Sequence, residues 1–307
     1  MKSIAFLFAG QGSQYVGMGQ ELYDTYDIVQ ERFEQASKIL GYNVASILSG
    51  DEEKLNDTRY TQPLMFVLYV SILDVLNKHG ITSTHTCGLS LGEYGALYDA
   101  GCFDFATGLQ LLQARGEAMA DASAKVEGAM SAILGMDAAD VKRIISTTSG
   151  YVTIANYNTY GQLVISGETD AVQQVNDVAV ANGAKRAILL NTSGPFHSKL
   201  MAPAQQTFET VLANVELNKA NKKLLTNVNG SYAPDDLKTA MADQITSSVY
   251  FYQMIEQLIK DGVTTFVEIG PKKTLSGFVK KIDRSLDITN VEDLQSLSLT
   301  LEKLEVA

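Results

Sequence analysis

The stretch THTCGLSLGEY, residues 84–94, places Ser90 between two glycines, directly after a short apolar segment and directly before a run with helical character. The spacing Gly88-x-Ser90-x-Gly92 is typical of a sharp turn from a strand into a helix, which exposes the serine hydroxyl at the carboxyl end of a sheet. Glycines on both sides relieve the crowding that such a turn creates. The stretch therefore indicates an α/β sheet with Ser90 as the candidate nucleophile, although such glycines also occur at ordinary helix starts.

Strands and helices alternate on both sides of this turn. Residues 4–8 form a continuous apolar run that ends in the glycine-rich loop AGQGSQ, which is the pattern of a buried parallel strand. Residues 62–78 predict a long apolar helix. We expect it to end at His79 and Gly80, because a cationic residue and a glycine are typical of a helix C-terminus. The alternation predicts an α/β fold with a mainly parallel, α/β-hydrolase-like sheet. The other expected strands are at 84–87, 224–229 and 263–270, and the other helices are in the twenties and thirties, at 91–98, 103–120, after His197, within 236–260 and at 272–281.

The order of elements changes between residues 125 and 195, where we expect strand, helix, strand, strand, helix, strand. This order matches the split βαβ unit of ferredoxin-like domains. We therefore expect a small ferredoxin-like α+β domain at 125–195, inserted into a large α/β domain whose two parts are residues 1–124 and 196–307. The segments of the small domain are 128–136, 137–146, 151–156, 162–167, 168–183 and 184–190.

Composition excludes several classes of function. The chain has 307 residues and a formal net charge of -11, which argues against general nucleic-acid binding because phosphates require a basic surface. No apolar run approaches the roughly 20 residues that a membrane helix requires, so we expect a soluble protein with no membrane partner. The two cysteines, Cys87 and Cys102, form no metal-ligand spacing and make a poor disulfide framework, which favours a reducing cytoplasm. The loop AGQGSQ does not match a phosphate-binding loop, so we expect no nucleotide there.

A serine hydroxyl needs a base to accept its proton, and the chain offers three histidines. His79 lies at a helix end and His85 lies within a strand, so capping and packing account for them. His197 lies in a loop where the small domain ends and the large one resumes, and such junctions are common ligand sites. His197 is therefore the predicted base, the alternative being a histidine held near a helix N-terminus. Asp137 is a better helix N-cap than catalytic acid, so a dyad is expected, with the imidazole held by a backbone carbonyl or an amide.

Two further groups complete the candidate site. The backbone N–H of Leu91, directly after the nucleophile, can stabilise an oxyanion, and the Gln11 amide in the loop AGQGSQ can supply a second donor unless this loop is a plain turn. Arg115 lies in an apolar helical run. A buried arginine requires an anionic partner, which is either a salt-bridge carboxylate or an anionic ligand.

Six segments of the chain occur in the order known from one enzyme family. The chain resembles the malonyl-CoA:acyl carrier protein transacylases of fatty-acid synthesis over essentially its full length. The segments are FAGQGSQ (8–14), GLSLGEY (88–94), QARGEAM (113–119), NYNTYGQLVISG (156–167), SGPFHSKLMAPA (193–204) and VEIGP (267–271).

The resemblance implies a ping-pong reaction with no metal and no dissociable cofactor. Malonyl-CoA acylates Ser90, coenzyme A leaves, and the phosphopantetheine thiol of acyl carrier protein takes the malonyl group. His197 acts as base and acid, and Gln11 with Leu91 supplies the oxyanion amides. Arg115 binds the malonyl carboxylate.

The resemblance also implies roles for residues around this centre. The backbone carbonyl of Gln244 orients His197, and Asn158 lies in a loop near the site. An acidic carrier protein requires a local basic surface on this acidic chain. The implied acyl-pocket residues are Met119, Met130 and Phe196, and the candidate docking residues are Lys185, Arg186, Lys272, Lys273, Lys280 and Lys281.

The chain departs from the family pattern at a few positions. Leu89 stands where many members have histidine before the nucleophile, which leaves His197 as the only histidine expected beside Ser90. The proline and tryptophan of the Gln244 segment appear as Ser248 and Phe251, and the proline of the asparagine loop appears as Tyr160.

Two rival functions remain open at this stage. One is a serine acyl-hydrolase or thioesterase, which releases the acyl group to water, and a patatin-like version of it would pair Ser90 with Asp261. The other is a noncatalytic subunit that binds carrier protein.

Overall fold

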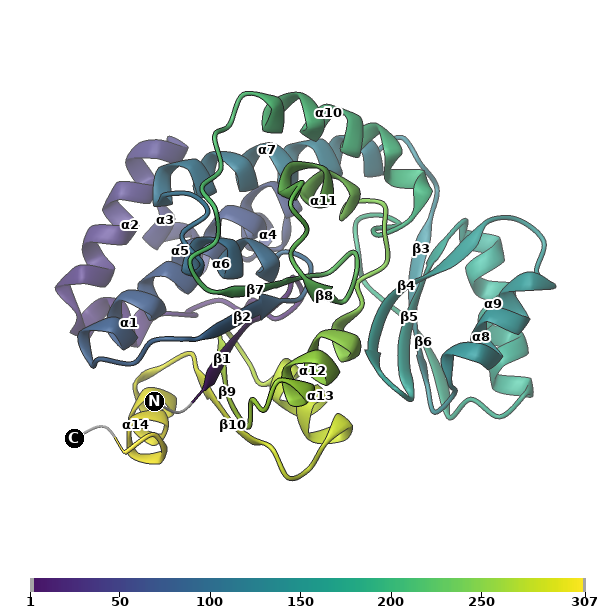
Figure 1. Ribbon diagram of the computed structural model, residues 1–307. Helices are drawn as coiled ribbons and strands as arrows, with labels where there is room; N and C mark the ends of the chain where they lie inside the picture. Colours follow the sequence, from purple (N-terminus) through teal and green to yellow (C-terminus); the bar gives the residue numbers. More distant parts are fainter. Residues whose placement is uncertain (1–2, 306–307) are drawn as a thin grey trace.

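The computed structural model describes residues 3–305 and contains two sheets (Figure 1). The larger sheet has the strand order β10-β9-β1-β2-β7-β8, in which the named pairs are parallel except for β7 with β8. The predicted α/β class with a mainly parallel sheet is therefore confirmed. Its strands are β1 (Ile4–Phe8), β2 (His85–Gly88), β7 (Lys223–Thr226), β8 (Ser231–Tyr232), β9 (Thr265–Ile269) and β10 (Asp287–Val291).

The central strand β1 is apolar along its length because both of its faces are covered. Successive side chains of a strand point to opposite faces. Phe6 and Phe8 therefore pack into the core under one helical layer, while Ala5 and Leu7 pack into a second core on the other side. The first layer holds α5 (Thr58–Lys78), α6 (Gly92–Asp99), α7 (Phe105–Ser123) and α10 (Ala202–Ala213), and the second holds α12 (Phe251–Lys260) and α13 (Thr274–Ile282).

The remaining elements surround these layers. Figure 1 places the early helices on the side of the molecule away from the small sheet, and the helix α14 near the start of the chain. These elements are α1 (Gln20–Thr25), α2 (Asp27–Leu40), α3 (Val44–Gly50), α4 (Glu52–Asn56), the short 3-10 helix Lys199–Met201, α11 (Leu237–Asp243) and α14 (Leu294–Lys303).

The smaller sheet is antiparallel and has the ferredoxin-like order β4-β5-β3-β6. Its helices cover one face, and its other face turns toward the large sheet (Figure 1). Met130, Ala132 and Val164 on that second face join the core of the large sheet. Its elements are β3 (Ala129–Leu134), α8 (Ala138–Ser146), β4 (Val152–Thr159), β5 (Gln162–Gly167), α9 (Thr169–Ala181) and β6 (Arg186–Leu189).

Local capping explains where the observed elements differ from the expected ones. The helix α5 begins at Thr58 rather than at residue 62, because the Asp57 side chain accepts the Arg59 N–H at 2.9 Å and starts the helix there. The helix α13 begins at Thr274 rather than at residue 272, because the buried Glu268 carboxylate accepts two N–H groups of its first turn. The strand β10 and the helix α14 were not predicted.

The predicted end and capping residues are in place. His79 is the C-cap of α5, and Gly80 has a positive φ of 74°. The Asp137 side chain accepts the Asp140 N–H at 2.8 Å at the start of α8, which confirms it as an N-cap. His85 is buried in β2.

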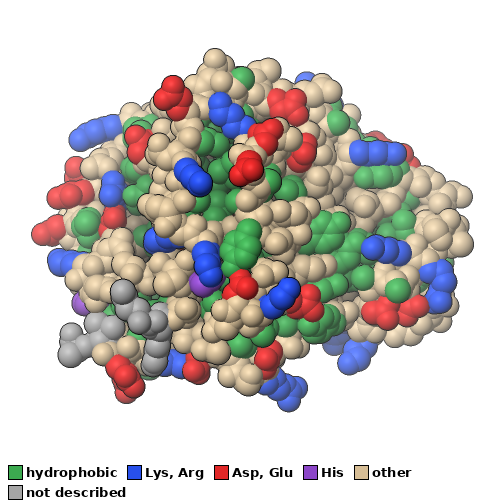
Figure 2. Space-filling view, in the orientation of Figure 1, with side chains coloured by type: hydrophobic (Ala, Val, Ile, Leu, Met, Phe, Trp, Pro, Cys, Tyr) green, Lys and Arg blue, Asp and Glu red, His purple; other side chains and the backbone are tan. Residues whose placement is uncertain are grey.

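The surface carries both signs of charge. Figure 2 shows lysine and arginine side chains interspersed with aspartate and glutamate over the face in view. No helix within residues 3–305 is both long and apolar enough to cross a membrane.

Candidate active site

The turn between β2 and α6 holds Ser90 in a strained conformation. Ser90 has φ 52°, in the left-handed region that non-glycine residues seldom occupy. A Cβ atom on Gly88 would collide with the backbone of Gly92, and one on Gly92 would collide with the Phe8 carbonyl. Both glycines are therefore required, because α6 begins directly against the turn and against β1.

Ser90 contacts His197. The Ser90 Oγ lies 2.7 Å from His197 Nε2. The other ring nitrogen, Nδ1, lies 2.9 Å from the Gln244 carbonyl and 3.2 Å from the Ser247 carbonyl. Since a carbonyl only accepts, Nδ1 carries the proton and Nε2 is left to accept the serine proton. Two backbone carbonyls therefore occupy the place that a carboxylate has in a triad.

His197 is a neutral base over most of the accessible pH range. Burial, followed by the charge of Arg115, lowers the pKa of His197 to about 4, against the opposing effect of the two carbonyls. Above that pH the imidazole is neutral and can accept a proton. Below it, protonation removes the acceptor.

We expect the reaction of Ser90 with a fluorophosphonate to be independent of pH from about pH 8 to about pH 6 and to fall below that as the pH approaches the His197 pKa. The measurement is the rate of adduct formation by intact-protein mass spectrometry. Arg115→Met should move the midpoint upward, because it removes one of the two causes of the low pKa. Arg32→Met, in the distant helix α2, should leave the midpoint in place, and a midpoint near the ordinary histidine value in the unaltered protein would contradict this view of the site.

Arg115 lies beside the nucleophile without an anionic partner. Its side chain is buried, with 1 % of its surface exposed. Nη1 donates to Gln62 Oε1 at 2.8 Å, and Nη2 donates to Gln244 Oε1 at 2.9 Å and lies 3.4 Å from Ser90 Oγ. Among residues 3–305 it forms no salt bridge, so the internal ion pair that the sequence allowed is not present in that range.

This arrangement favours an anionic ligand. Burial lowers the pKa of Arg115, but a guanidinium remains charged at neutral pH. Two neutral amides hold the guanidinium and cannot neutralise it. The buried Glu93 carboxylate attracts the guanidinium but forms no salt bridge with it. A carboxylate that enters the site can therefore supply the direct ionic partner that Arg115 lacks among the described residues.

Two backbone amides are available to stabilise an oxyanion. Within the described range, neither the Leu91 N–H nor the Gln11 N–H donates a hydrogen bond, whereas the Ser90 N–H is bound to Asn227 Oδ1. Leu91 stands at the N-terminal end of α6, where the helix dipole favours negative charge. The Gln11 loop is anchored through its side chain, which donates to Thr58 Oγ1 at 2.8 Å.

A cleft of about 550 Å³ opens over Ser90 between the two sheets. Leu91 and Gln244 do not line it and lie behind it as buried supports. Asn158 lies on β4, and its buried Oδ1 has no hydrogen-bond partner among the described residues. The predicted site residues that line the cleft are Gln11, Ser90, Arg115, Met119, Met130, Asn158, Phe196 and His197.

The sequence analysis missed two buried amide residues in the site, Gln62 and Asn227. Gln62 holds Arg115, and Asn227 holds the turn at Ser90. A signal for Asn227 exists, because it directly follows β7, as the Gln11 loop follows β1 and the Ser90 turn follows β2. Polar residues at the carboxyl ends of neighbouring parallel strands gather at one edge of the sheet.

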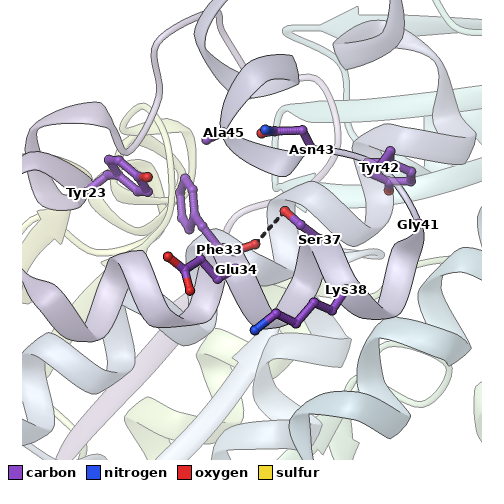
Figure 3. Close-up of a pocket in the computed structure, with 9 residues that line it drawn as sticks. All are labelled: Tyr23, Phe33, Glu34, Ser37, Lys38, Gly41, Tyr42, Asn43 and Ala45. Atoms are coloured by element: carbon purple, nitrogen blue, oxygen red, sulfur yellow. Dashed lines mark hydrogen bonds between the residues drawn. The ribbon is translucent and has the colours of Figure 1, made fainter.

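The cavity beside the early helices does not offer a comparable site. A cavity of about 660 Å³ lies at α1, α2 and α3, and its lining includes no histidine (Figure 3). Its Ser37 hydroxyl donates to the Phe33 carbonyl of its own helix at 2.7 Å. Among residues 3–305, no group of three or more His, Cys, Asp or Glu side chains is arranged to hold a metal ion.

Asp261 is not placed to form a dyad with Ser90. It is the C-cap of α12 and accepts a hydrogen bond from the Tyr232 hydroxyl. It interacts with His85, which begins β2, whereas Ser90 follows the end of β2. The patatin-like alternative is therefore wrong, and the expected turn before β9 is confirmed.

Comparisons with known proteins agree with this geometry. Residues 5–299 match the family model described as "Acyl transferase domain". The malonyl CoA-acyl carrier protein transacylase of Bacillus subtilis (strain 168) is 41% identical over 311 residues, which cover 99% of this chain and 98% of that protein.

Solved structures give the same result. The crystal structure of MCAT from Streptococcus pneumoniae superposes with a TM-score of 0.95 at 41% identity and covers 98% of this chain and 100% of that one. A malonyl-transacylase in complex with its type II PKS acyl-carrier protein superposes with a TM-score of 0.94 at 34% identity, with 98% and 100% coverage.

Proposed function

This chain belongs to the acyl transferase domain family, and from that membership we propose that it transfers a malonyl group from malonyl-CoA to the phosphopantetheine thiol of acyl carrier protein, supplying fatty-acid synthesis. One observation carries the choice of a malonyl group. The unneutralised guanidinium of Arg115 lies 3.4 Å from Ser90 Oγ, and malonyl is an acyl group that ends in a carboxylate. A carboxylate bound to Arg115 places the thioester carbonyl next to the nucleophile.

The first half-reaction acylates Ser90. His197 Nε2 takes the hydroxyl proton while Ser90 Oγ attacks the thioester carbonyl, and the N–H groups of Leu91 and Gln11 stabilise the oxyanion. When the C–S bond breaks, His197 returns its proton to the departing sulfur, and coenzyme A leaves. The Gln244 carbonyl keeps the imidazole oriented through both proton transfers.

The second half-reaction repeats these steps with the carrier-protein thiol. His197 takes the thiol proton, the sulfur attacks the malonyl ester, and the C–O bond to Ser90 breaks. The proton then returns to Ser90 Oγ. No group other than the two substrates is consumed in these steps.

The wall of the cleft fits the proposed substrate. We assign the acyl pocket to Met119, Met130 and Phe196, which surround the space beside Arg115 with apolar side chains. The amide of Asn158, whose Oδ1 lacks a partner among the described residues, is available to a polar arm of the substrate.

We also propose that the small inserted domain comprises residues 125–195 and that residues 1–124 and 196–307 form one domain.

Docking of the carrier protein should use lysines at the cleft mouth. Lys272 Nζ lies 3.4 Å from the Gly12 carbonyl, and Lys281 Nζ lies 3.0 Å from Gln162 Oε1. Gly12 and Gln162 both line the cleft, so these lysines lie beside its entrance. Lys280 instead donates to two carbonyls of the turn after α13, which makes it a weaker candidate.

The other candidates are less favoured. Lys273 is the N-cap residue of α13, and Lys185 with Arg186 lies at the start of β6.

We place the enzyme in the cytoplasm, and the two buried free cysteines, Cys87 and Cys102, support a reducing compartment.

Incubation with malonyl-CoA should add one malonyl mass to the Ser90 peptide, and addition of phosphopantetheinylated acyl carrier protein should remove it. The acyl-enzyme accumulates because water is a poorer nucleophile than the thiol at this site. Mass spectrometry of the intact protein and of the Ser90 peptide measures both events. Ser90→Ala gives the matched control without an adduct.

The outcomes separate the rival functions. Loss of the adduct in buffer as fast as with carrier protein would indicate a hydrolase. Absence of any adduct on a folded protein would indicate a noncatalytic subunit. Carrier protein without its phosphopantetheine arm should leave the adduct in place.

A further inference from the structure

We propose that Asn227 is the positioning residue that holds Ser90 in its reactive conformation. Asn227 is fully buried and directly follows β7, on the strand next to the one that leads into Ser90. Its side-chain Oδ1 accepts the Ser90 N–H at 2.7 Å, and its Nδ2 donates to the Gly88 carbonyl at 2.7 Å. One amide group therefore spans the turn on both sides of Leu89.

These two bonds follow the hydrogen-bond pattern of paired parallel strands. The strands β2 and β7 pair in parallel with Thr86 opposite Leu224, and this register places Asn227 opposite Leu89. In a parallel pair, a residue bonds through its backbone to the carbonyl before and the N–H after its opposite residue. Here the side chain of Asn227 makes those bonds, at the point where the main chain leaves β7 and turns.

Asn227 is itself fixed in place by its neighbours. Its backbone N–H donates to the Glu93 carboxylate at 2.5 Å, and its carbonyl accepts the Tyr250 N–H at 3.0 Å. Glu93 lies in the first turn of α6, directly after the Ser90 turn. Asn227 thus joins the end of β2 to the start of α6 across the strained residue.

The two hydrogen bonds that the Asn227 side chain makes to the Ser90 turn have a consequence for catalysis. A left-handed φ is unfavourable for a serine, so Ser90 needs support to stay in it. Without the two bonds the turn can relax and move Ser90 Oγ away from His197 Nε2. Because Asn227 occupies the Ser90 N–H, that amide is not an oxyanion donor. Arg115 keeps Gln62 as a partner in either case, whereas its second partner, Gln244, also lies 3.4 Å from Asn227 Oδ1. Substrate binding therefore depends less on the Asn227 bonds than the position of Ser90 Oγ does.

Asn227→Leu should lower the rate of Ser90 phosphonylation by a fluorophosphonate about 10²-fold, the usual effect of a misplacement of about 1 Å. The kcat for malonyl transfer should fall in parallel, while KM for malonyl-CoA should change by much less. Asn229→Leu is the matched control, because Asn229 lies in the same turn but its side chain bonds only to the adjoining ends of β7 and β8. That control should lower the melting temperature without slowing phosphonylation. A folded Asn227→Leu protein with the rate of the unaltered protein would overturn the inference.

Asn227→Asp provides a test that a merely structural role does not pass. The ionised carboxyl accepts the Ser90 N–H but cannot donate to the Gly88 carbonyl, whereas the protonated carboxyl makes both bonds. Burial raises the pKa of such a group, as it raises the pKa of the adjacent Glu93 to about 7. Because Glu93 titrates in both proteins, the decisive profile is the phosphonylation rate of the variant divided by that of the unaltered protein, which should rise from about pH 8 to about pH 6. A flat profile would overturn the inference, and this profile decides the case if Asn227→Leu does not fold.

The inference rests on the proposed function only for the transfer assay. Phosphonylation requires Ser90 and His197 but neither malonyl-CoA nor carrier protein. If malonyl transfer is absent and the phosphonylation results hold, the proposed function fails and the role of Asn227 stands.

Discussion

Replacing His197 with glutamine should lower kcat for malonyl transfer by about 10²- to 10⁴-fold, the range that general acid–base catalysis contributes. Glutamine keeps a polar side chain of similar reach, but its amide cannot take the Ser90 proton or return it to a leaving group. Both half-reactions should therefore slow. The measurement is kcat with saturating carrier protein, together with the rate at which the malonyl adduct appears on Ser90.

The matched control is His85→Gln. His85 is as buried as His197, with 3 % of its surface exposed for each, but it lies at the opposite end of β2. His85→Gln should leave kcat near the value of the unaltered protein. If the two variants lost equal activity, the effect would come from stability, and His197 would not be the base.

Arg115→Ala should lower kcat/KM for malonyl-CoA by about 10²- to 10³-fold, as expected when a buried charge partner of a ligand is removed. Transfer of an acetyl group should be unchanged or faster, because acetyl has no carboxylate and the variant has no unneutralised charge. The measurement is the ratio of kcat/KM for malonyl-CoA to that for acetyl-CoA. This ratio should fall by about 10²- to 10³-fold, the same factor as kcat/KM for malonyl-CoA.

Arg115→Lys refines this test. Lysine keeps the positive charge but cannot form the planar pair of hydrogen bonds with a carboxylate, so its selectivity should lie between those of the unaltered protein and Arg115→Ala. Equal losses for malonyl and acetyl substrates in Arg115→Ala would contradict the binding of the malonyl carboxylate by Arg115. They would indicate that Arg115 supports the cleft through Gln62 and Gln244 instead.

The fold was largely predictable because its decisive signals are local. The continuous apolar run of β1, the glycines around Ser90 and the alternation within the small sheet are patterns of a few residues each. The edge strand β10 was missed because only one of its ends is fully buried, so no apolar run marks it. The starts of α5 and α13 depend on capping by Asp57 and Glu268. Glu268 lies within β9, seven and eight positions before the residues whose N–H groups it accepts, and not at the N-cap position where capping is recognised in a sequence.

The site residues also divide into those that a local sequence pattern reveals and those that it does not. Ser90 lies in a local motif, and elimination among three histidines leads to His197. Arg115 was recognised as an arginine in an apolar helix, but its lack of a counterion appears only when the surrounding chain is folded. The contacts of Gln62 and Asn227 join residues 53 and 137 positions apart in the chain, respectively, so spacing in the sequence does not reveal them.

The division of the cleft between two sheets allows part of the acyl pocket to be changed apart from the reacting atoms. The nucleophile, the base and Arg115 belong to the large sheet and its connections, whereas Met130 and Asn158 belong to the small one. The strand β4 joins the segment before α12 through backbone hydrogen bonds at Val249, which tolerate changes of side chain. Substitutions in β3 and β4 can therefore reshape the room for the acyl chain while the reacting atoms keep their positions, which makes the small sheet the place to engineer an enzyme for other acyl groups.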